Sequence, residues 1–184
     1  MESLEGRLLL ASPQLLDPNF VHTVVLLIEH NEMGALGVVL NRPTSKTIED
    51  LWRQVGQSPC NSQTPVYLGG PVSGPLMAVH TLDGLAEMEI VPGVFFAVKK
   101  HNLDELVRRD DEPQMRVFVG HAGWGPGQLE REIEEGAWRT TPANLVDIFQ
   151  QPDDLWQRLF DRLEIGVLPA MLGIKHVPPD PSLN

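Results

Sequence analysis

Hydrophobic residues in this chain fall in short runs bounded by glycine, proline or aspartate, and this pattern predicts several short strands. Residues 21–28 are rich in β-branched side chains and predict a buried strand. Residues 31–34 then supply a reversal, and residues 37–40 supply a partner strand, so we expect a hairpin. Arg7 to Ala11 forms a further apolar run. Similar runs predict strands over residues 66–68, 76–81, 93–98 and 115–119.

Helical patterns lie between these runs. Thr47 and Asp50 have the spacing of a capping box, which predicts a helix that ends near Gly56. Asn102 is expected to cap a helix that runs to Arg109. Residues 128–135 predict a helix stopped by Gly136, and residues 153–163 predict an amphipathic helix.

Strands and helices alternate irregularly, and at least one hairpin is antiparallel, which favours an α+β fold with a mixed sheet. The length of 184 residues suits one domain, which we expect to span residues 1–177, followed by a flexible tail over residues 178–184. Residues 57–65 predict a polar surface loop, within which the thiol of Cys60 is expected to be exposed.

Charge restricts the classes of partner. The chain has 14 Lys plus Arg against 25 Asp plus Glu, a formal net charge of -11. Such a field opposes direct binding to DNA and docking on anionic lipid. The N-terminus is acidic and lacks the long apolar run of a secretory signal, so we expect a cytoplasmic protein. One cysteine and six histidines without metal-ligand spacing predict no metal and no cofactor.

The first candidate site lies where the hairpin strands begin and end. If the turn centres on residues 32–33, Thr23 lies near Arg42, and the hairpin then gathers a polar group at its end: Asp17, Asn19, His22, Asn41 and Arg42. The Arg42 guanidinium suits a carboxylate or phosphate ligand. Alternatively, the Asx residues only satisfy turn backbone, and Arg42 pairs with Asp17.

Two glycine-rich segments are the other candidates. Residues 69–75, beginning Gly69-Gly70-Pro71, bring backbone close either to a ligand or to another strand. Residues 120–128 contain His121, Trp124 and Gln128 on a turn that could offer amides to an anion. The alternative for that turn is an aromatic plug with a satisfied histidine. Neither segment has the spacing of a P-loop, a dinucleotide fingerprint or a nucleophile elbow.

A family resemblance rests on motifs that extend in order from Gly6 to Trp138. These comprise GRLLLASP at 6–13, DPNF at 17–20, TVVLL at 23–27, EH at 29–30, GA at 34–35, GVVLNRP at 37–43, GGPV at 69–72, VH at 79–80, GHAGW at 120–124, GQLE at 127–130 and Trp138. On these residues the chain resembles the YqgE/AlgH family of bacterial proteins.

The resemblance implies an α+β fold with a central mixed, partly barrel-like sheet surrounded by helices. It implies no catalytic residues, because the family is largely of unknown function; one branch is named as a transcriptional regulator of alginate production. His121 departs from the Tyr or Phe expected there in many relatives.

Two hypotheses for function remain from the sequence. The first is a non-enzymatic regulatory or binding protein that acts through a small anionic ligand or a protein partner, with any effect on transcription indirect. The second is an enzyme that uses Arg42 to position an anionic metabolite and Asp17, His22 or His121 to transfer a proton. A third possibility, a simple interaction module, would require exposed apolar surface.

Overall fold

The computed structural model describes residues 3–55, 60–109 and 113–171, whose strands form two open sheets. In the first sheet, all neighbouring strands are antiparallel. Its order is β10-β3-β2-β1-β11, with bounds β1 (Arg7–Ala11), β2 (Val24–Asn31), β3 (Gly34–Val39), β10 (Ala122–Trp124) and β11 (Trp138–Pro142).

The second sheet is mixed, because β5 and β9 are parallel while the other pairs are antiparallel. Its order is β4-β5-β9-β6-β8-β7, with bounds β4 (Pro43–Thr47), β5 (Pro65–Leu68), β6 (Met77–His80), β7 (Met88–Val91), β8 (Val94–Ala97) and β9 (Met115–Val119). The predicted α+β class with mixed strands is therefore confirmed. The strands do not form one barrel-like sheet, since neither sheet closes on itself.

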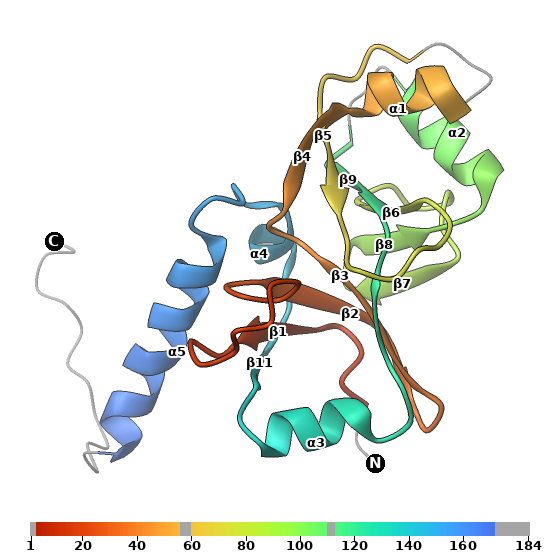
Figure 1. Cartoon of the computed structure of the whole chain (residues 1–184). Helices are drawn as coiled ribbons and strands as arrows, with labels where there is room; N and C mark the ends of the chain where they lie inside the picture. The colour runs from red at the N-terminus through yellow and green to blue at the C-terminus, as the bar shows by residue number, and fades with distance from the viewer. Residues whose placement is uncertain (1–2, 56–59, 110–112, 172–184) are drawn as a thin grey trace, which may run out of the picture.

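Helices cover the outer surfaces of both sheets (Figure 1). α1 and α2 lie together beside the second sheet, α3 lies at the opposite end of the molecule, and α4 and α5 lie along one side. Their bounds are α1 (Ile48–Val55), α2 (Lys100–Arg108), α3 (Gln128–Glu134), α4 (Leu145–Phe149) and α5 (Leu155–Met171). No helix in the described part of the chain is both long enough and apolar enough to cross a bilayer.

The continuous apolar runs of β1 and β2 arise because both faces of the first sheet are covered. Leu8, Leu10, Leu26 and Ile28 pack in one core cluster, which also contains α5 residues, whereas alternate residues such as Leu9 pack in a second cluster near α3. Side chains on a strand point alternately to opposite faces, so a strand buried on both sides is hydrophobic at every position. This burial explains why the sequence shows a run there rather than an alternation.

Local signals in the sequence located several elements correctly. The 31–34 reversal joins β2 to β3, and the capping box is formed, with Asp50 N to Thr47 Oγ1 and Thr47 N to Asp50 Oδ2 both at 3.1 Å. The four other predicted strands correspond to β5, β6, β8 and β9. The predicted amphipathic helix corresponds to α5 and continues to Met171. Gly56 and residues 178–184 lie outside the described residues.

Two local predictions were wrong. Asn102 does not cap α2, which begins two residues earlier; its side chain instead donates to Glu87 at 2.8 Å. Cys60 is buried rather than exposed, because it packs with Ile48, Trp52 and other side chains of α1 and the second sheet. A polar sequence around a cysteine does not reveal that the cysteine itself faces a core.

The buried His80 of β6 provides a test of the fold through its protonation. Burial lowers the pKa of His80 from 6.5 to about 4, although the Glu87 carboxylate and the Leu85 carbonyl act in the opposite direction. Between these values the unfolded imidazole binds a proton that the folded one does not. The free energy of unfolding should therefore fall as the pH falls from 6.5 to 4, by about 3 kcal/mol from this residue.

His80→Asn is the matched variant, because an amide oxygen can still accept the Leu82 main-chain N–H that His80 Nδ1 accepts at 3.2 Å. Denaturant unfolding at pH 7, 5.5 and 4 should show a smaller acid-induced loss in His80→Asn than in the wild type. An identical loss in both proteins would contradict the assignment of a neutral buried imidazole.

Candidate functional site

Asn41 holds the end of the hairpin next to the loop that precedes it. Its Oδ1 accepts the main-chain N–H of Val24 at 2.9 Å, and its Nδ2 donates to the carbonyl of His22 at 2.9 Å. The predicted proximity of residues 17–23 to residues 41–42 is thus confirmed. The expected register placed Thr23 opposite Arg42. The observed register differs from it by one residue, since Val25 pairs with Val39, and the shift occurs at an irregularity between Leu27 and Glu29.

Arg42 carries a positive charge without a carboxylate partner in the described chain. Its Nη2 donates to the carbonyls of Pro18 at 3.1 Å and Val21 at 3.4 Å, while Nε and Nη1 have no acceptor among the described residues. The predicted alternative in which Arg42 pairs with Asp17 is wrong, since the Arg42 guanidinium contacts main-chain carbonyls instead. Asp17 Oδ1 instead accepts the Asn19 main-chain N–H at 2.8 Å, as expected for an Asx turn.

The two glycine-rich segments pack directly against each other. A Cβ on Gly69 would lie 2.3 Å from the Gly120 carbonyl oxygen, and one on Gly70 would lie 2.3 Å from the His121 carbonyl carbon. Val72 and His121 then form an antiparallel bridge with two N–H···O bonds of 3.0 Å. Glycine is required here because no larger residue fits between the two backbones.

The same contact leaves two main-chain donors unused. Within the described residues, neither the Gly70 N–H nor the Gly120 N–H has a hydrogen-bond acceptor. Gly70 is buried and Gly120 is half-buried. Buried amide groups are nearly always paired, so an acceptor from outside the described chain, such as a ligand or water, would satisfy these two N–H groups.

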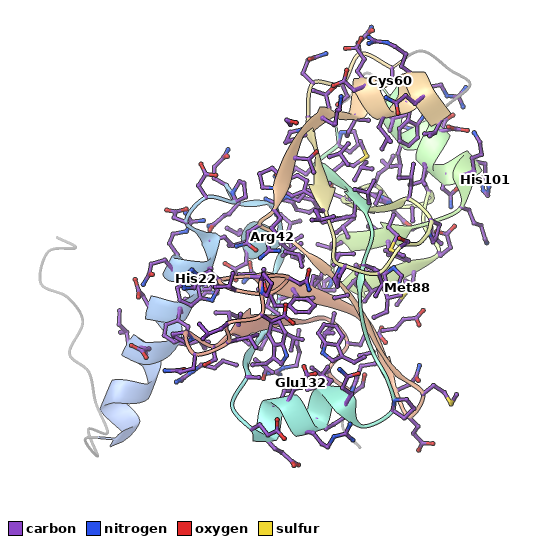
Figure 2. The ribbon with its side chains drawn as sticks, viewed as in Figure 1. His22, Arg42, Cys60, Met88, His101 and Glu132 are labelled. Atoms are coloured by element: carbon purple, nitrogen blue, oxygen red, sulfur yellow. The ribbon has the colours of Figure 1, made fainter. Side chains whose placement is uncertain are left out.

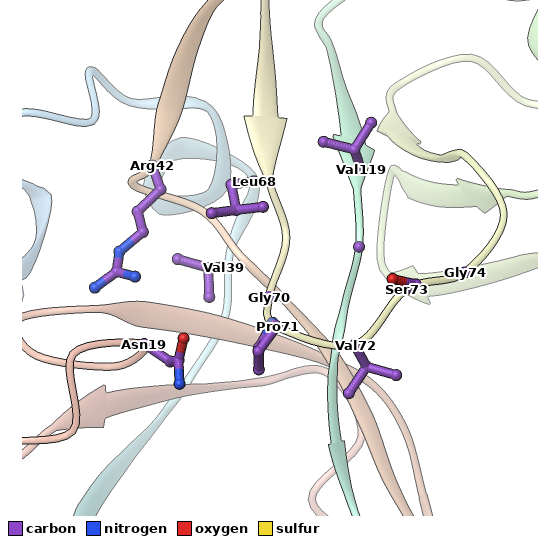
Figure 3. A pocket seen from close by; sticks show the side chains of 11 residues that line it. Asn19, Val39, Arg42, Leu68, Gly70, Pro71, Val72, Ser73, Gly74 and Val119 are labelled. Carbon is purple, nitrogen blue, oxygen red and sulfur yellow. The ribbon is translucent and has the colours of Figure 1, made fainter.

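Arg42 and these two glycines line one pocket of about 400 Å³. Figure 3 shows Arg42 and Asn19 on one side and the segment from Gly70 to Gly74 on the other, with Val39 and Leu68 between them. Arg42 is the only charged residue among the described residues that line it; the complete lining is Asn19, Val39, Arg42, Leu68, Gly70, Pro71, Val72, Ser73, Gly74, Val119 and Gly120. The lining combines one cation, two glycines whose main-chain N–H groups have no acceptor among the described residues, and several aliphatic side chains.

The remaining predicted site residues lie outside this lining. His22 has φ 53°, and its ring lies 4.3 Å from that of Trp156, close to Arg42 in the molecule (Figure 2). The His121 ring lies against Gly74, with a buried Nδ1 that has no partner among the described residues. Asp17, Asn41 and Gly69 organise backbone around the pocket without lining it.

Trp124 and Gln128 belong to a separate cluster around Glu132 of α3. Glu132 Oε2 accepts the indole N–H groups of Trp124 at 2.9 Å and Trp138 at 2.8 Å, and Oε1 accepts Gln128 Nε2 at 2.8 Å. Gln128 Oε1 in turn accepts the Gly125 main-chain N–H at 3.0 Å. The turn therefore already holds a carboxylate of the chain itself, which favours the aromatic plug over an anion site, although the histidine of that alternative is not satisfied, because His121 Nδ1 has no partner among the described residues. The sequence carried one signal for this cluster: Gln128 and Glu132 have the spacing that places two side chains on the same face of a helix.

Arg116 of β9 was not singled out from the sequence. It lies beside a second hollow of about 900 Å³ and is itself only 4% exposed. Its Nη1 donates to the Leu40 carbonyl at 2.9 Å, its Nη2 donates to the Gln150 carbonyl, and its guanidinium lies 4.8 Å from the Tyr67 ring centroid. These contacts make Arg116 a connection between β9, the end of β3 and the segment after α4.

No group of three or more potential metal ligands occurs within the described ranges. A family model described as AlgH-like matches residues 8–167. The chain belongs to the AlgH-like family.

Relatives and solved structures agree with this assignment. UPF0301 proteins from Streptomyces avermitilis and Streptomyces coelicolor are 39% and 41% identical to the chain, and each alignment covers 100% of the chain and 97% of the relative. The solution structure of the AlgH protein from Pseudomonas aeruginosa is similar, with a TM-score of 0.73, 28% identity and 96% of each chain covered. A crystal structure of protein DIP2367 from Corynebacterium diphtheriae has a TM-score of 0.70 and 28% identity, covering 88% of this chain and 90% of that one. The resemblance found in the sequence is confirmed.

Proposed function

We propose that this AlgH-like protein is a non-enzymatic binding protein that takes a small anion in the Arg42 pocket. The observation that carries the proposal is that Arg42, which has no carboxylate partner in the described chain, lines the same pocket as Gly70 and Gly120, whose main-chain N–H groups have no acceptor among the described residues. Adjacent free amides and a guanidinium are the donors that proteins use to bind carboxylates and phosphates.

Binding is favoured over catalysis by the positions of the candidate acids and bases. Asp17, His22 and His121 do not line the pocket, and Arg42 is the only charged side chain among the described lining residues. A general acid or base must come within hydrogen-bond reach of the reacting group. No observation specifically favours the enzymatic alternative.

A regulatory role would then be indirect. The net charge of -11 opposes contact with the phosphates of DNA, so ligand occupancy would be communicated through another protein. The segments that form the pocket come from both sheets, so a bound anion would contact both sheets at once. A change in their relative position on binding is what a partner protein would detect.

Thermal denaturation with acetate or inorganic phosphate tests the proposal, with chloride at matched ionic strength as the reference. A ligand at about 100 times its dissociation constant adds roughly 2.7 kcal/mol of stability, which raises the melting temperature of a domain of this size by about 5 to 10 °C. At least one of the two anions is expected to stabilise the wild type. The absence of any anion-specific shift would contradict the proposal.

Arg42→Met is expected to weaken anion binding at least about tenfold, because a charge-assisted hydrogen bond contributes about 1.5 to 3 kcal/mol. Arg53→Met is the matched control, since Arg53 lies on α1 outside the pocket and is paired with Glu49.

Leu68→Glu is the second pocket variant. Leu68 lies next to Arg42, because the Arg42 carbonyl accepts the Leu68 N–H at 2.9 Å. The substitution therefore adds a carboxylate beside the guanidinium without removing any group that bonds Arg42 to Pro18 and Val21. Unchanged anion affinity in both Arg42→Met and Leu68→Glu would show that the anion binds outside this pocket.

A further inference from the structure

The wall of the Arg42 pocket carries exposed aliphatic side chains. Leu68 and Val72 are each 42% exposed, although both are large hydrophobic residues. Both line the pocket, together with Val39 and Val119 (Figure 3). Apolar residues that remain accessible around a polar centre are typical of a ligand site, because the ligand covers them.

The charge of the pocket matches a single negative charge. Arg42 is the one charged side chain in the described lining, and its free donors are on Nε and Nη1. The N–H groups of Gly70 and Gly120 offer two further uncharged donors. A carboxylate has one charge and two oxygens to share among these donors, whereas a phosphate dianion would hold a second charge next to Leu68 and Val72.

We infer that the ligand is a monocarboxylate attached to a short branched aliphatic group. This inference rests on the proposed function, and it names the class of anion. The carboxylate lies between Arg42 and the free amides of the glycine segments, and the aliphatic group covers Leu68 and Val72. The volume of about 400 Å³ is near the lower end for ligand pockets, so the aliphatic group is small.

Two sources could present this chemistry: a free branched-chain carboxylic acid, and the C-terminus of a peptide whose last residue is aliphatic. The two differ in whether a peptide chain leads away from the carboxylate. An acetylated tetrapeptide that ends in valine, compared with isovalerate, distinguishes them. Tighter binding of the peptide identifies a protein C-terminus as the source, and tighter binding of isovalerate identifies a free acid; both support a branched aliphatic carboxylate.

Isothermal titration of the full chain at pH 7 with acetate, isovalerate, isovaleramide and inorganic phosphate tests the inference. Isovalerate is expected to bind about tenfold more tightly than acetate, because each buried methylene strengthens binding several-fold. Isovaleramide has the same shape without the charge and is expected not to bind. The double variant Leu68→Gln/Val72→Thr should lose most of the tenfold preference for isovalerate over acetate.

Equal affinities for acetate and isovalerate, or tighter binding of phosphate, would overturn the aliphatic assignment and leave the proposed anion site intact. Binding of isovaleramide as tightly as isovalerate would overturn both the carboxylate assignment and the proposed anion site, since the charge would then contribute nothing to binding. Failure of every one of these anions to bind the wild type would also overturn both. Retention of the tenfold preference in the double variant would show that the aliphatic group does not contact Leu68 and Val72.

Discussion

Replacing Arg116 by methionine is expected to lower the free energy of unfolding by about 3 kcal/mol. The loss would leave the carbonyls of Leu40 and Gln150 without the guanidinium that now donates to them, and would remove the contact with the Tyr67 ring. Burial lowers the pKa of Arg116, while Tyr67 acts in the opposite direction, so the wild type already bears a desolvation cost. Methionine relieves that cost, which is why the expected loss is not larger.

Equilibrium denaturation with guanidinium chloride measures this effect. Arg53→Met again serves as the control and should change stability by less than about 1 kcal/mol, because its ion pairs are exposed and lie within one helix. Arg116→Lys should fall between the wild type and Arg116→Met, since one ammonium can reach fewer carbonyls than the planar guanidinium. A neutral or stabilising Arg116→Met would mean that relief of desolvation outweighs both carbonyl contacts.

Glu132→Ala is the second substitution with a large expected effect, again about 3 kcal/mol of stability. One carboxylate oxygen accepts the indole N–H groups of both Trp124 and Trp138, whose side chains are buried. Each buried donor left without an acceptor costs about 1 to 3 kcal/mol. Water has partial access to Glu132, which is half-buried, and this access reduces the summed cost of the two unpaired indole N–H groups.

Glu134→Ala is the matched control on the same helix, because Glu134 is exposed. Glu132→Gln should be intermediate, since an amide oxygen can accept the indole N–H groups without the charge. Denaturation followed by tryptophan fluorescence reports both stability and the surroundings of Trp124 and Trp138. Equal stability of Glu132→Ala and Glu134→Ala would contradict the structural role given to Glu132.

The sequence predicted elements whose signals are local. The β2–β3 hairpin and the capping box of α1 depend on residues a few positions apart. Strands β10 and β11 were missed because they are short and are formed by distant pairing: Trp138 pairs with Ala11, far away in the sequence. A polar segment such as residues 138–142 has no local feature that distinguishes a strand from a loop.

The sequence also predicted only part of the candidate site. The hairpin placed the loop that contains Asn19 near Arg42, as predicted, but the irregularity between Leu27 and Glu29 shifted the register by one residue, and the position of the turn does not reveal such a shift. The meeting of Gly70 with Gly120 depends on the parallel pairing of β5 with β9, which no local pattern indicates. Trp124 and Gln128 were grouped with the site because a glycine-rich turn can bind either an external anion or a carboxylate of its own chain.

In the proposed site, the amides of Gly70 and Gly120 and the Arg42 side chain bind one anion. Amide chemical shifts of the ¹⁵N-labelled protein, followed during titration with acetate at pH 7, test it most directly. We expect saturable shifts at Gly70 and Gly120 that disappear in Arg42→Met, with Gly84 and Gly136 unchanged, since these two glycines lie outside the pocket. Saturable shifts elsewhere with none at Gly70 and Gly120, or no saturable shifts at all, would contradict it.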